Sequence, residues 1–147
     1  MAAGFTLKKN NLNILKKFVL KNFLESGAST NQIFNYDSEI SSIAFNKNFY
    51  DDIKKLEPFG TGNLNPTFFL KGLKVIRATK LDNKHISLIL KSKTGFTIKS
   101  ISFNSVNSKV GEYLLNYKNT INVLGQINEN IWNNKKTLQL TISDVII

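Results

Sequence analysis

The sequence predicts an α+β N-terminal part followed by an all-β domain, in which five strands close a Greek-key barrel with one short helix. Apolar residues recur at helical spacing before residue 57, and they alternate with polar residues, as in strands, after residue 68. The stretch between them, residues 58–67, contains both prolines and two of the eight glycines. Proline ends helices and glycine permits sharp turns, so this stretch is expected to link residues 1–57 to residues 68–147.

The N-terminal part is predicted to contain two amphipathic helices and one short strand. The first helix is expected over residues 11–25, with Gly27 at its end. Its apolar stripe consists of Leu12, Leu15, Phe18, Val19 and Phe23. A strand is expected over residues 33–37, and a second helix over residues 46–56 with Phe49, Ile53 and Leu56 buried.

The linker is predicted to turn the backbone sharply twice. Pro58 disfavours a helical conformation at Glu57, so the second helix should end there. Gly60 and Gly62 permit a positive φ and Asn63 tolerates one, while Pro66 favours an extended exit into the first strand.

Five strands are expected in the second half, with a short helix over residues 110–117 between the third and the fourth. They span residues 69–79, 85–91, 96–103, 120–127 and 136–145. Ile86, Leu88 and Leu90 alternate along the second strand and should face the core. In the third strand, Phe96 and Phe103 are expected in the core, and a β-bulge near Lys99 and Ser100 would reconcile their positions. A polar loop is expected over residues 128–135.

This order of elements is that of the OB-fold. An OB-fold is a small barrel that binds oligonucleotides on its second and third strands and on the loops after its first and fourth strands. The sequence therefore predicts an OB-fold domain over residues 68–147.

The positive charge of the chain is concentrated in the predicted barrel. The formal net charge is +10, of which residues 1–67 carry +2 and residues 68–147 carry +8. Such an excess attracts polyanions. Codon bias in an AT-rich genome is an alternative source of the lysines, but it does not explain the scarcity of acidic residues in one half. Arg77 is the only arginine, and a surface of lysines suits phosphate contacts without sequence specificity.

Neither a catalytic site nor a metal site is expected on this chain. Cysteine is absent, which excludes disulfides and thiolate chemistry, and His85 is the only histidine. Asp51 and Asp52 are adjacent on a helix and point about 100° apart, so a solvated helix face is favoured over a metal site. No apolar run approaches a membrane span and no secretory signal is present, so a cytoplasmic protein without membrane contact is expected.

Residues 56–68 resemble a signature of the RecJ family, the single-stranded-DNA-specific exonucleases among the DHH phosphoesterases. The resemblance rests on L-E-P-F-G-T-G-N-x-x-P-x-F, with Leu64 where the family usually has proline. Its matching residues are Pro58, Phe59, Gly60, Gly62, Asn63 and Pro66. The segment 130–140 is similar to the end of the family's OB domain, with Asn134 at a position where glycine is common.

The N-terminus resembles the end of a motif in the DHH-associated domain of the same family. Residues 2–6 match its end, while the Gly-Gly-His that would precede them is absent. The resemblance implies that residues 1–57 are the C-terminal remnant of that domain. Either the chain has been cut or an open reading frame restarts inside a longer gene.

The resemblance further implies the C-terminal part of a 5′→3′ exonuclease of DNA repair and recombination. The catalytic DHH domain would lie outside this chain, together with its Mn²⁺ or Mg²⁺, and no cofactor is expected here. The implied partners are single-stranded DNA and the missing catalytic half of the enzyme. The sequence predicts no oligomeric state.

Trp132 is the first candidate for binding DNA, because it lies in the predicted loop between the fourth and fifth strands, where it would stack on a base. The alternative is that Trp132 covers the mouth of the barrel as part of the core. Candidate phosphate-binding residues lie beside it, in the loop after the first strand, and on or beside the second and third strands. They are Lys135, Lys136, Lys80, Lys84, His85, Lys91, Lys93 and Lys99.

Three alternatives to this function stay open from the sequence. A stand-alone RNA-binding OB module would prefer RNA in competition, because the 2′-hydroxyl adds contacts. If the chain is instead a protein-interaction domain for a repair partner, Trp132→Ala would leave its oligonucleotide binding unchanged and would abolish binding of that partner. A decayed gene piece would have no function of its own.

Overall fold

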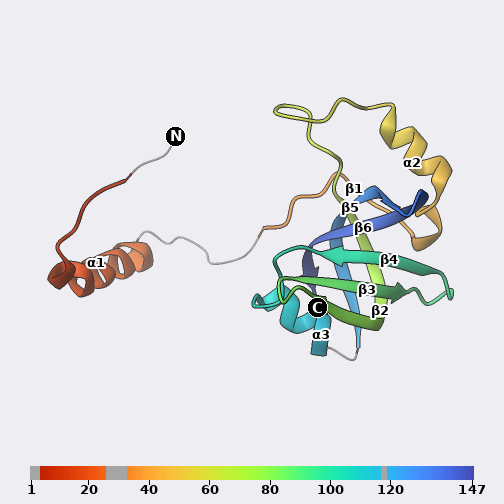
Figure 1. The fold of residues 1–147 in the computed structure, drawn as a ribbon. Coiled ribbons are helices and arrows are strands. Elements are labelled where there is room, and N and C mark those ends of the chain that lie inside the picture. Colours follow the sequence, from red (N-terminus) through yellow and green to blue (C-terminus); the bar gives the residue numbers. More distant parts are fainter. Residues whose placement is uncertain (1–3, 26–32, 117–118) are drawn as a thin grey trace. The chain divides into compact units, whose positions relative to one another are not determined.

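The computed structural model describes residues 4–25, 33–116 and 119–147 (Figure 1). The chain divides into two compact units, residues 1–34 and residues 35–147, and each is described by itself.

The first unit contains one helix, α1 (Leu12–Glu25), which follows the 3₁₀ turn η1 (Lys9–Asn11). The prediction of a helix over residues 11–25 is confirmed, while the predicted end at Gly27 lies outside the described residues. No residue of α1 is buried, and most of its predicted apolar stripe, including Phe18 and Val19, is exposed.

The second unit is a closed five-stranded barrel, so the predicted OB-fold is confirmed (Figure 1). Its strands are β2 (Phe68–Leu81), β3 (His85–Lys91), β4 (Thr97–Ser102), β5 (Thr120–Trp132) and β6 (Lys135–Ile146). They pair in the order β2-β3-β4-β6-β5, and a further pairing of β2 with β5 closes the barrel. All these pairs are antiparallel except β4 with β6. The helix α3 (Lys109–Asn116) connects β4 to β5.

The turns between the strands use residues that accept a positive φ. Asp82 and Asn83 adopt it between β2 and β3, and Gly95 adopts it between β3 and β4. Asn133 and Asn134 adopt it between β5 and β6. Asparagine tolerates the left-handed region and glycine enters it without steric cost, so the local sequence fixes these hairpins.

The β-bulge predicted near Lys99 and Ser100 is wrong. β3 and β4 pair in unbroken register from Ile86 with Ser102 to Lys91 with Thr97. The inward positions of β4 are Ile98, Ser100 and Ser102, all buried. The barrel therefore accepts two small hydroxyl side chains in its interior and needs no change of face. Phe96 and Phe103 lie just before and just after β4 and are 38% and 53% exposed, which corrects their predicted burial.

Register shifts occur instead in β2 and β5. One lies between Leu70 and Leu73, where Gly72 has a φ of 64° and its N–H donates to Asn122 Oδ1 at 3.0 Å. Another separates Leu124 from Gly125. A side chain at Gly125 would place its Cβ 2.5 Å from the backbone oxygen of Thr141, so β6 approaches β5 this closely only at a glycine.

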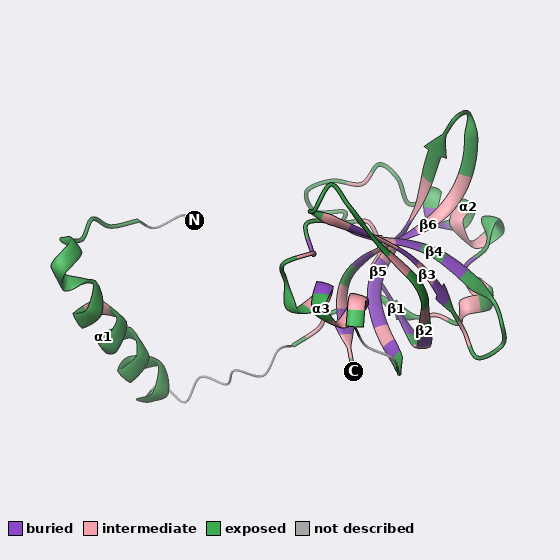
Figure 2. Cartoon of the chain, turned by 60° about the horizontal axis from the view of Figure 1, so that its bottom comes forward, coloured by how far each residue is buried: buried purple, intermediate pink, exposed green. Residues whose placement is uncertain are grey.

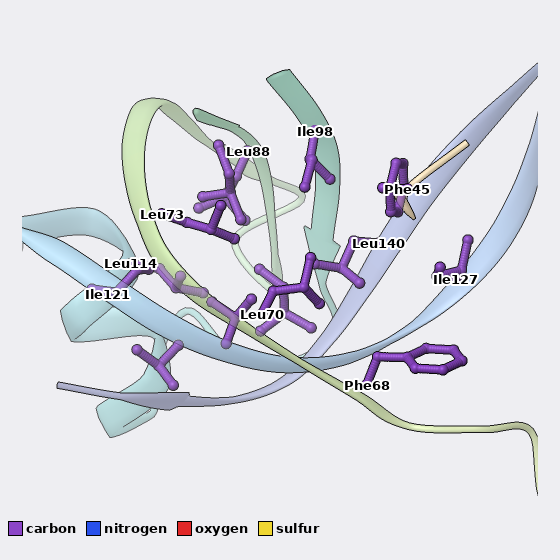
Figure 3. Packing of buried hydrophobic residues seen from close by; sticks show 14 of the residues in the cluster. Phe45, Phe68, Leu70, Leu73, Leu88, Ile98, Leu114, Ile121, Ile127 and Leu140 are labelled. Carbon is purple, nitrogen blue, oxygen red and sulfur yellow. The ribbon is translucent and has the colours of Figure 1, made fainter. Parts of the chain in front are cut away.

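Leucine and isoleucine side chains from all five strands fill the barrel (Figure 3). Leu70, Leu88, Ile98 and Leu140 are at most 2% exposed and lie in one cluster. Leu114 joins them from α3. Burying each of these side chains contributes about 1.5–3 kcal/mol, so the alternation predicted from sequence is also the main source of stability.

Residues 35–57 pack against the barrel, and Phe45 and Ile53 belong to its core cluster. This segment contains β1 (Ser38–Glu39), the 3₁₀ turn η2 (Ser42–Ala44) and α2 (Lys47–Lys54). Asn46 caps α2, since its side chain accepts a hydrogen bond from the N–H of Phe49 at 3.1 Å. In Figure 1, α2 and α3 lie at opposite ends of the barrel.

Two predictions for this segment are corrected. Residues 33–37 do not form the expected strand. The strand β1 begins at residue 38 instead, because residues 38 and 39 pair with an edge of β2. Leu56 is exposed and lies beyond the end of α2.

The linker forms one turn that the Asn63 side chain ties to the chain before it. Asn63 Nδ2 donates to the carbonyl oxygens of Leu56 and Pro58, both at 2.9 Å. Gly60 and Asn63 bond each other through their backbones, and only Gly62 in this turn has a positive φ. Of the three residues that could adopt a positive φ, only Gly62 does so, and Asn63 stabilises the turn through its side chain. Phe59 is half-buried against the core, and Pro66 leads into β2.

Candidate nucleic-acid interface

The β5–β6 hairpin is longer than the sequence predicts. Residues 128–132 continue β5, and the two-residue turn at Asn133 and Asn134 joins Trp132 directly to Lys135. The predicted loop over residues 128–135 is therefore wrong, because strand pairing satisfies the backbone of these polar residues. The tip of the hairpin is exposed in Figure 2. Trp132 itself is 74% exposed, which excludes its alternative place in the core.

Strand alternation gives the outer part of the hairpin two chemically different faces. One face carries Trp132 and Lys135, which pair across the hairpin, and then Asn130 with Thr137. The other face carries Glu129 and Lys136, joined by an ion pair of 3.2 Å.

The first face of the hairpin borders a groove of about 340 Å³. The opposite side of this groove is the outer surface of β3 and β4. The groove is lined by Ser87, Leu88, Ile89, Lys99, Ser100, Asn130, Trp132, Lys135, Thr137 and Gln139. It thus combines an exposed indole, two ammonium groups, hydroxyls, amides and an apolar floor.

A second hollow continues the groove across β3 towards β2. It is lined by Arg77, Thr79, Leu81, Ser87, Leu88 and Ile89, the last three of which it shares with the groove. Arg77 and Ile89 are cross-strand partners, as are Ile89 and Lys99. The outer side of β2, β3 and β4 therefore forms one surface. β3 and β4 line the groove, and β2 and β3 line the second hollow.

The cations of this surface have no carboxylate partner among the described residues, whereas several lysines elsewhere on the barrel do. In the part of the chain that the structure describes, Arg77, Lys99 and Lys135 form no ion pair. Lys47, Lys55, Lys71 and Lys136 each pair with a carboxylate, at distances between 2.6 and 3.7 Å. The hydrogen bond that Lys47 donates to Asp51 raises the pKa of Lys47, and the one that Lys71 donates to Glu39 raises the pKa of Lys71. Unpaired positive charge thus remains where the groove lies.

The structure brings three of the predicted binding residues together in the groove: Lys99, Trp132 and Lys135. A second set, Lys80, Lys84 and His85, lies at the β2–β3 hairpin, where Lys80 belongs to β2 and not to the predicted loop. Lys91 and Lys93 lie at the opposite end of β3, and Lys93 borders a separate hollow with Lys71 and Glu39.

Lys136 is the one predicted binding residue that forms an ion pair within the described residues, and this pair lies outside the groove. It shares Glu129 with Lys47 of α2, in a hollow away from Trp132. Its hydrogen bond is the main cause that lowers the pKa of Glu129 below the ordinary value of 4.5, and partial burial opposes this shift.

Among the lining residues that sequence reasoning missed are Arg77, Ser87, Ile89, Thr137 and Gln139. Alternation along β3 and β6 already places four of them on the outer face, so this signal was available. Which outer residues meet in one groove depends on the hairpin that arches beside them.

The aspartates of α2 serve as ion-pair partners, Asp51 with Lys47 and Asp52 with Lys55. Among the described residues, no group of three or more His, Cys, Asp or Glu side chains could hold a metal ion. Across the same ranges, no helix is long and apolar enough to cross a membrane.

Comparison with known protein families shows to which family this barrel belongs. Residues 36–144 match the RecJ OB domain. The chain belongs to the RecJ OB domain family. The resemblance noted in the linker and in the β5–β6 hairpin is thereby confirmed, and the matched range includes the residues before the barrel that pack against its core.

Solved structures show the same fold. RecJ from Thermus thermophilus in complex with Mn²⁺ aligns with a TM-score of 0.62 at 19% identity, over 98% of this chain and 20% of that chain. Its complex with Mg²⁺ aligns with a TM-score of 0.61 at 19% identity, over 97% and 21% of the two chains. The chain thus spans about a fifth of the length of these relatives. No curated protein sequence matches the chain.

Proposed function

We propose that this chain is the single-stranded-DNA-binding part of a RecJ-like 5′→3′ exonuclease that acts in DNA repair and recombination. The observation that carries the proposal is the groove between the outer surface of β3–β4 and the β5–β6 hairpin. It presents an exposed indole beside unpaired cations on a fold known for binding oligonucleotides.

Each kind of side chain in the groove has a distinct part in binding. The Trp132 ring offers a face on which a base stacks, which contributes about 1–3 kcal/mol. Lys99 and Lys135 attract the phosphates, and Arg77 extends the positive charge across β3. Ser87, Thr137 and Gln139 provide hydroxyl and amide groups for hydrogen bonds to sugar or phosphate.

These groups favour binding without sequence preference. Stacking tolerates every base, and lysine acts on phosphate as a point charge. An exonuclease that moves along a strand needs contacts of this kind, because each new nucleotide has to fit the same site.

The cleavage step belongs to a catalytic domain outside the described residues, with Mn²⁺ or Mg²⁺ as its metal. The described residues hold the strand and guide it towards that domain in the cytoplasm. Membership in the RecJ OB domain family supports this division of tasks.

The test is a titration of the chain with a fluorescently labelled single-stranded oligonucleotide at several salt concentrations. The logarithm of the binding constant should fall linearly with that of salt, by about 0.7 for each phosphate contact. Binding that does not respond to salt would contradict the proposal.

Competition with unlabelled RNA and DNA of equal length completes the experiment. Equal or better competition by DNA supports the proposed substrate. Consistently tighter RNA binding would show that the 2′-hydroxyl is read and would favour the RNA-binding alternative.

A further inference from the structure

Phe103 is an exposed aromatic residue on the same outer surface as the groove. Thr97, Lys99 and Ile101 occupy the outward positions of β4, and Phe103 lies in the turn directly after its last residue, Ser102. Its side chain is 53% exposed. A phenylalanine in this position adds nothing to the core, so its ring is available to a ligand.

The Phe103 ring is supported from one side by His85. The two rings meet edge to face, with centroids 5.2 Å apart and planes at 77°. His85 is held in turn, because its Nδ1 accepts a hydrogen bond from the backbone N–H of Asn104 at 2.9 Å. The pair is thus fixed by the turn that follows β4, in which Asn104 has a φ of 52°.

This pair lies at the opposite end of the surface from Trp132. The register places His85 beside Leu81, which lines the second hollow, and that hollow shares three residues with the groove. No acidic side chain lines either hollow. From Ile89 and Ser87, which line the groove with Trp132, β3 advances two to four residues to His85, about 7–13 Å. This span exceeds the spacing of about 3.4 Å between neighbouring nucleotides of one strand, so the two aromatic sites suit different bases of the same strand.

We infer that Phe103, supported by His85, is a second base-stacking site for the strand that stacks on Trp132. The inference rests on the proposed function and adds the path of the DNA strand, which runs along β3 from the β5–β6 hairpin towards the β2–β3 hairpin. Lys80 and Lys84 of that hairpin form no ion pair within the described residues, so they are available for phosphates beside the second site.

Oligonucleotide length separates the two sites. Binding of oligothymidylates of about 4 and about 16 nucleotides, the limits of known OB-fold footprints, should be measured for the wild type, Phe103→Ala and Trp132→Ala. Phe103→Ala should weaken the long oligonucleotide at least about fivefold, the lower limit for loss of a stacked base, and should affect the short one less.

Phe96→Ala is the matched control. Phe96 is also an exposed phenylalanine next to β4, but it lies at the other end of the strand, away from His85. Phe96→Ala should leave binding of both lengths unchanged. Phe103→Leu should weaken binding as Phe103→Ala does, since leucine is apolar but has no aromatic face. Phe103→Trp should bind the long oligonucleotide as tightly as the wild type, since it keeps an aromatic ring.

The single tryptophan of the chain permits a direct readout. The double variant Trp132→Phe/Phe103→Trp carries its only indole at position 103. The long oligonucleotide should quench its fluorescence if a base stacks there, and thermal unfolding of each variant checks that it folds.

The outcomes distinguish the two proposals. The second site would be overturned if Phe103→Ala bound the long oligonucleotide as the wild type does and no quenching occurred at position 103. If Trp132→Ala lost binding in the same experiment, the proposed function would still stand. Failure of the wild type to bind single-stranded DNA would overturn both. Length-dependent loss in Phe103→Ala together with quenching supports the second site.

Discussion

Two regions of the barrel carry the same kind of charge and use it differently. On the side of α2 and β1, Lys47, Lys55 and Lys71 are held by carboxylates of their own neighbourhood. In the groove beside the β5–β6 hairpin and the second hollow that continues it, Arg77, Lys99 and Lys135 form no ion pair within the described residues, and Lys99 and Lys135 share the groove with an exposed tryptophan.

The comparison shows that the number of lysines does not define a nucleic-acid surface. Exposed ion pairs contribute little to stability, about 0–1 kcal/mol, but they cancel the local charge that a phosphate would meet. What distinguishes the groove is therefore the absence of acidic side chains from its lining, together with aromatic rings in the same place.

The largest expected effect on DNA affinity comes from removing the unpaired cations of the groove and the second hollow. The triple variant Arg77→Ala/Lys99→Ala/Lys135→Ala should lose roughly three orders of magnitude in single-stranded-DNA affinity at low salt, if each cation makes one charge-assisted contact of about 1.5 kcal/mol. Its salt slope should fall by about 2, from three lost contacts at about 0.7 each.

The matched control is Lys47→Ala/Lys55→Ala/Lys71→Ala, which removes the same formal charge from the ion-paired region. It should retain most of the affinity. Equal losses in both triple variants would show that only net charge matters, and the distinction between the two regions would fail. Fluorescence anisotropy titrations at several salt concentrations measure both.

The next effect concerns the aromatic part of the groove. Trp132→Ala should weaken binding by about 1–3 kcal/mol, or roughly 5- to 150-fold, because a stacked base is lost. The salt slope should stay unchanged, since no phosphate contact is removed. A variant that loses salt dependence instead of affinity would indicate that Trp132 only positions the lysines.

A third prediction concerns the barrel wall on which both regions depend. Gly125→Ala would push a Cβ against the backbone oxygen of Thr141, and overpacking of this kind costs about 1–3 kcal/mol. Urea unfolding should show the loss. Gly60→Ala is the control, because nothing lies within 4 Å of its added Cβ, and an unfolding midpoint that falls equally in both variants would contradict the argument.

The smallest effect lies in the ion-paired region and depends on pH. Lys136 lowers the pKa of Glu129 in the folded protein. Glu129 therefore contributes stability above its unfolded-state pKa, and this contribution is lost as the pH falls through the lower, folded-state value. The wild type should be slightly more stable than Glu129→Gln at neutral pH, and the difference should vanish in acid. Chemical unfolding at several pH values measures this difference, and a gap that widens in acid would refute the assignment.

Local patterns predicted the fold because its determinants are local. The alternation of Ile86, Leu88 and Leu90 defines β3 and its buried face without reference to the rest of the chain. The Asp82–Asn83 and Asn133–Asn134 turns follow from the φ values that these residues tolerate. The linker motif and the β5–β6 hairpin already indicated the family.

The site was only partly predictable. Lys99, Trp132 and Lys135 were named from sequence and lie in one groove, but Lys136, the neighbour of Lys135, points into an ion pair with Glu129. Arg77 and Gln139 are distant in sequence and meet this surface only through strand pairing. Phe103 was expected in the core, because hydrophobicity indicates burial but not the face of a strand.

The sequence by itself determined the strands, the turns, the basic character of the second half and the family, since each follows from residue type and short-range spacing. Tertiary structure alone decided which cations stay unpaired, which aromatic rings face solvent and where the groove runs. The physical reason is that these properties depend on strand register and on neighbours brought together from distant parts of the chain.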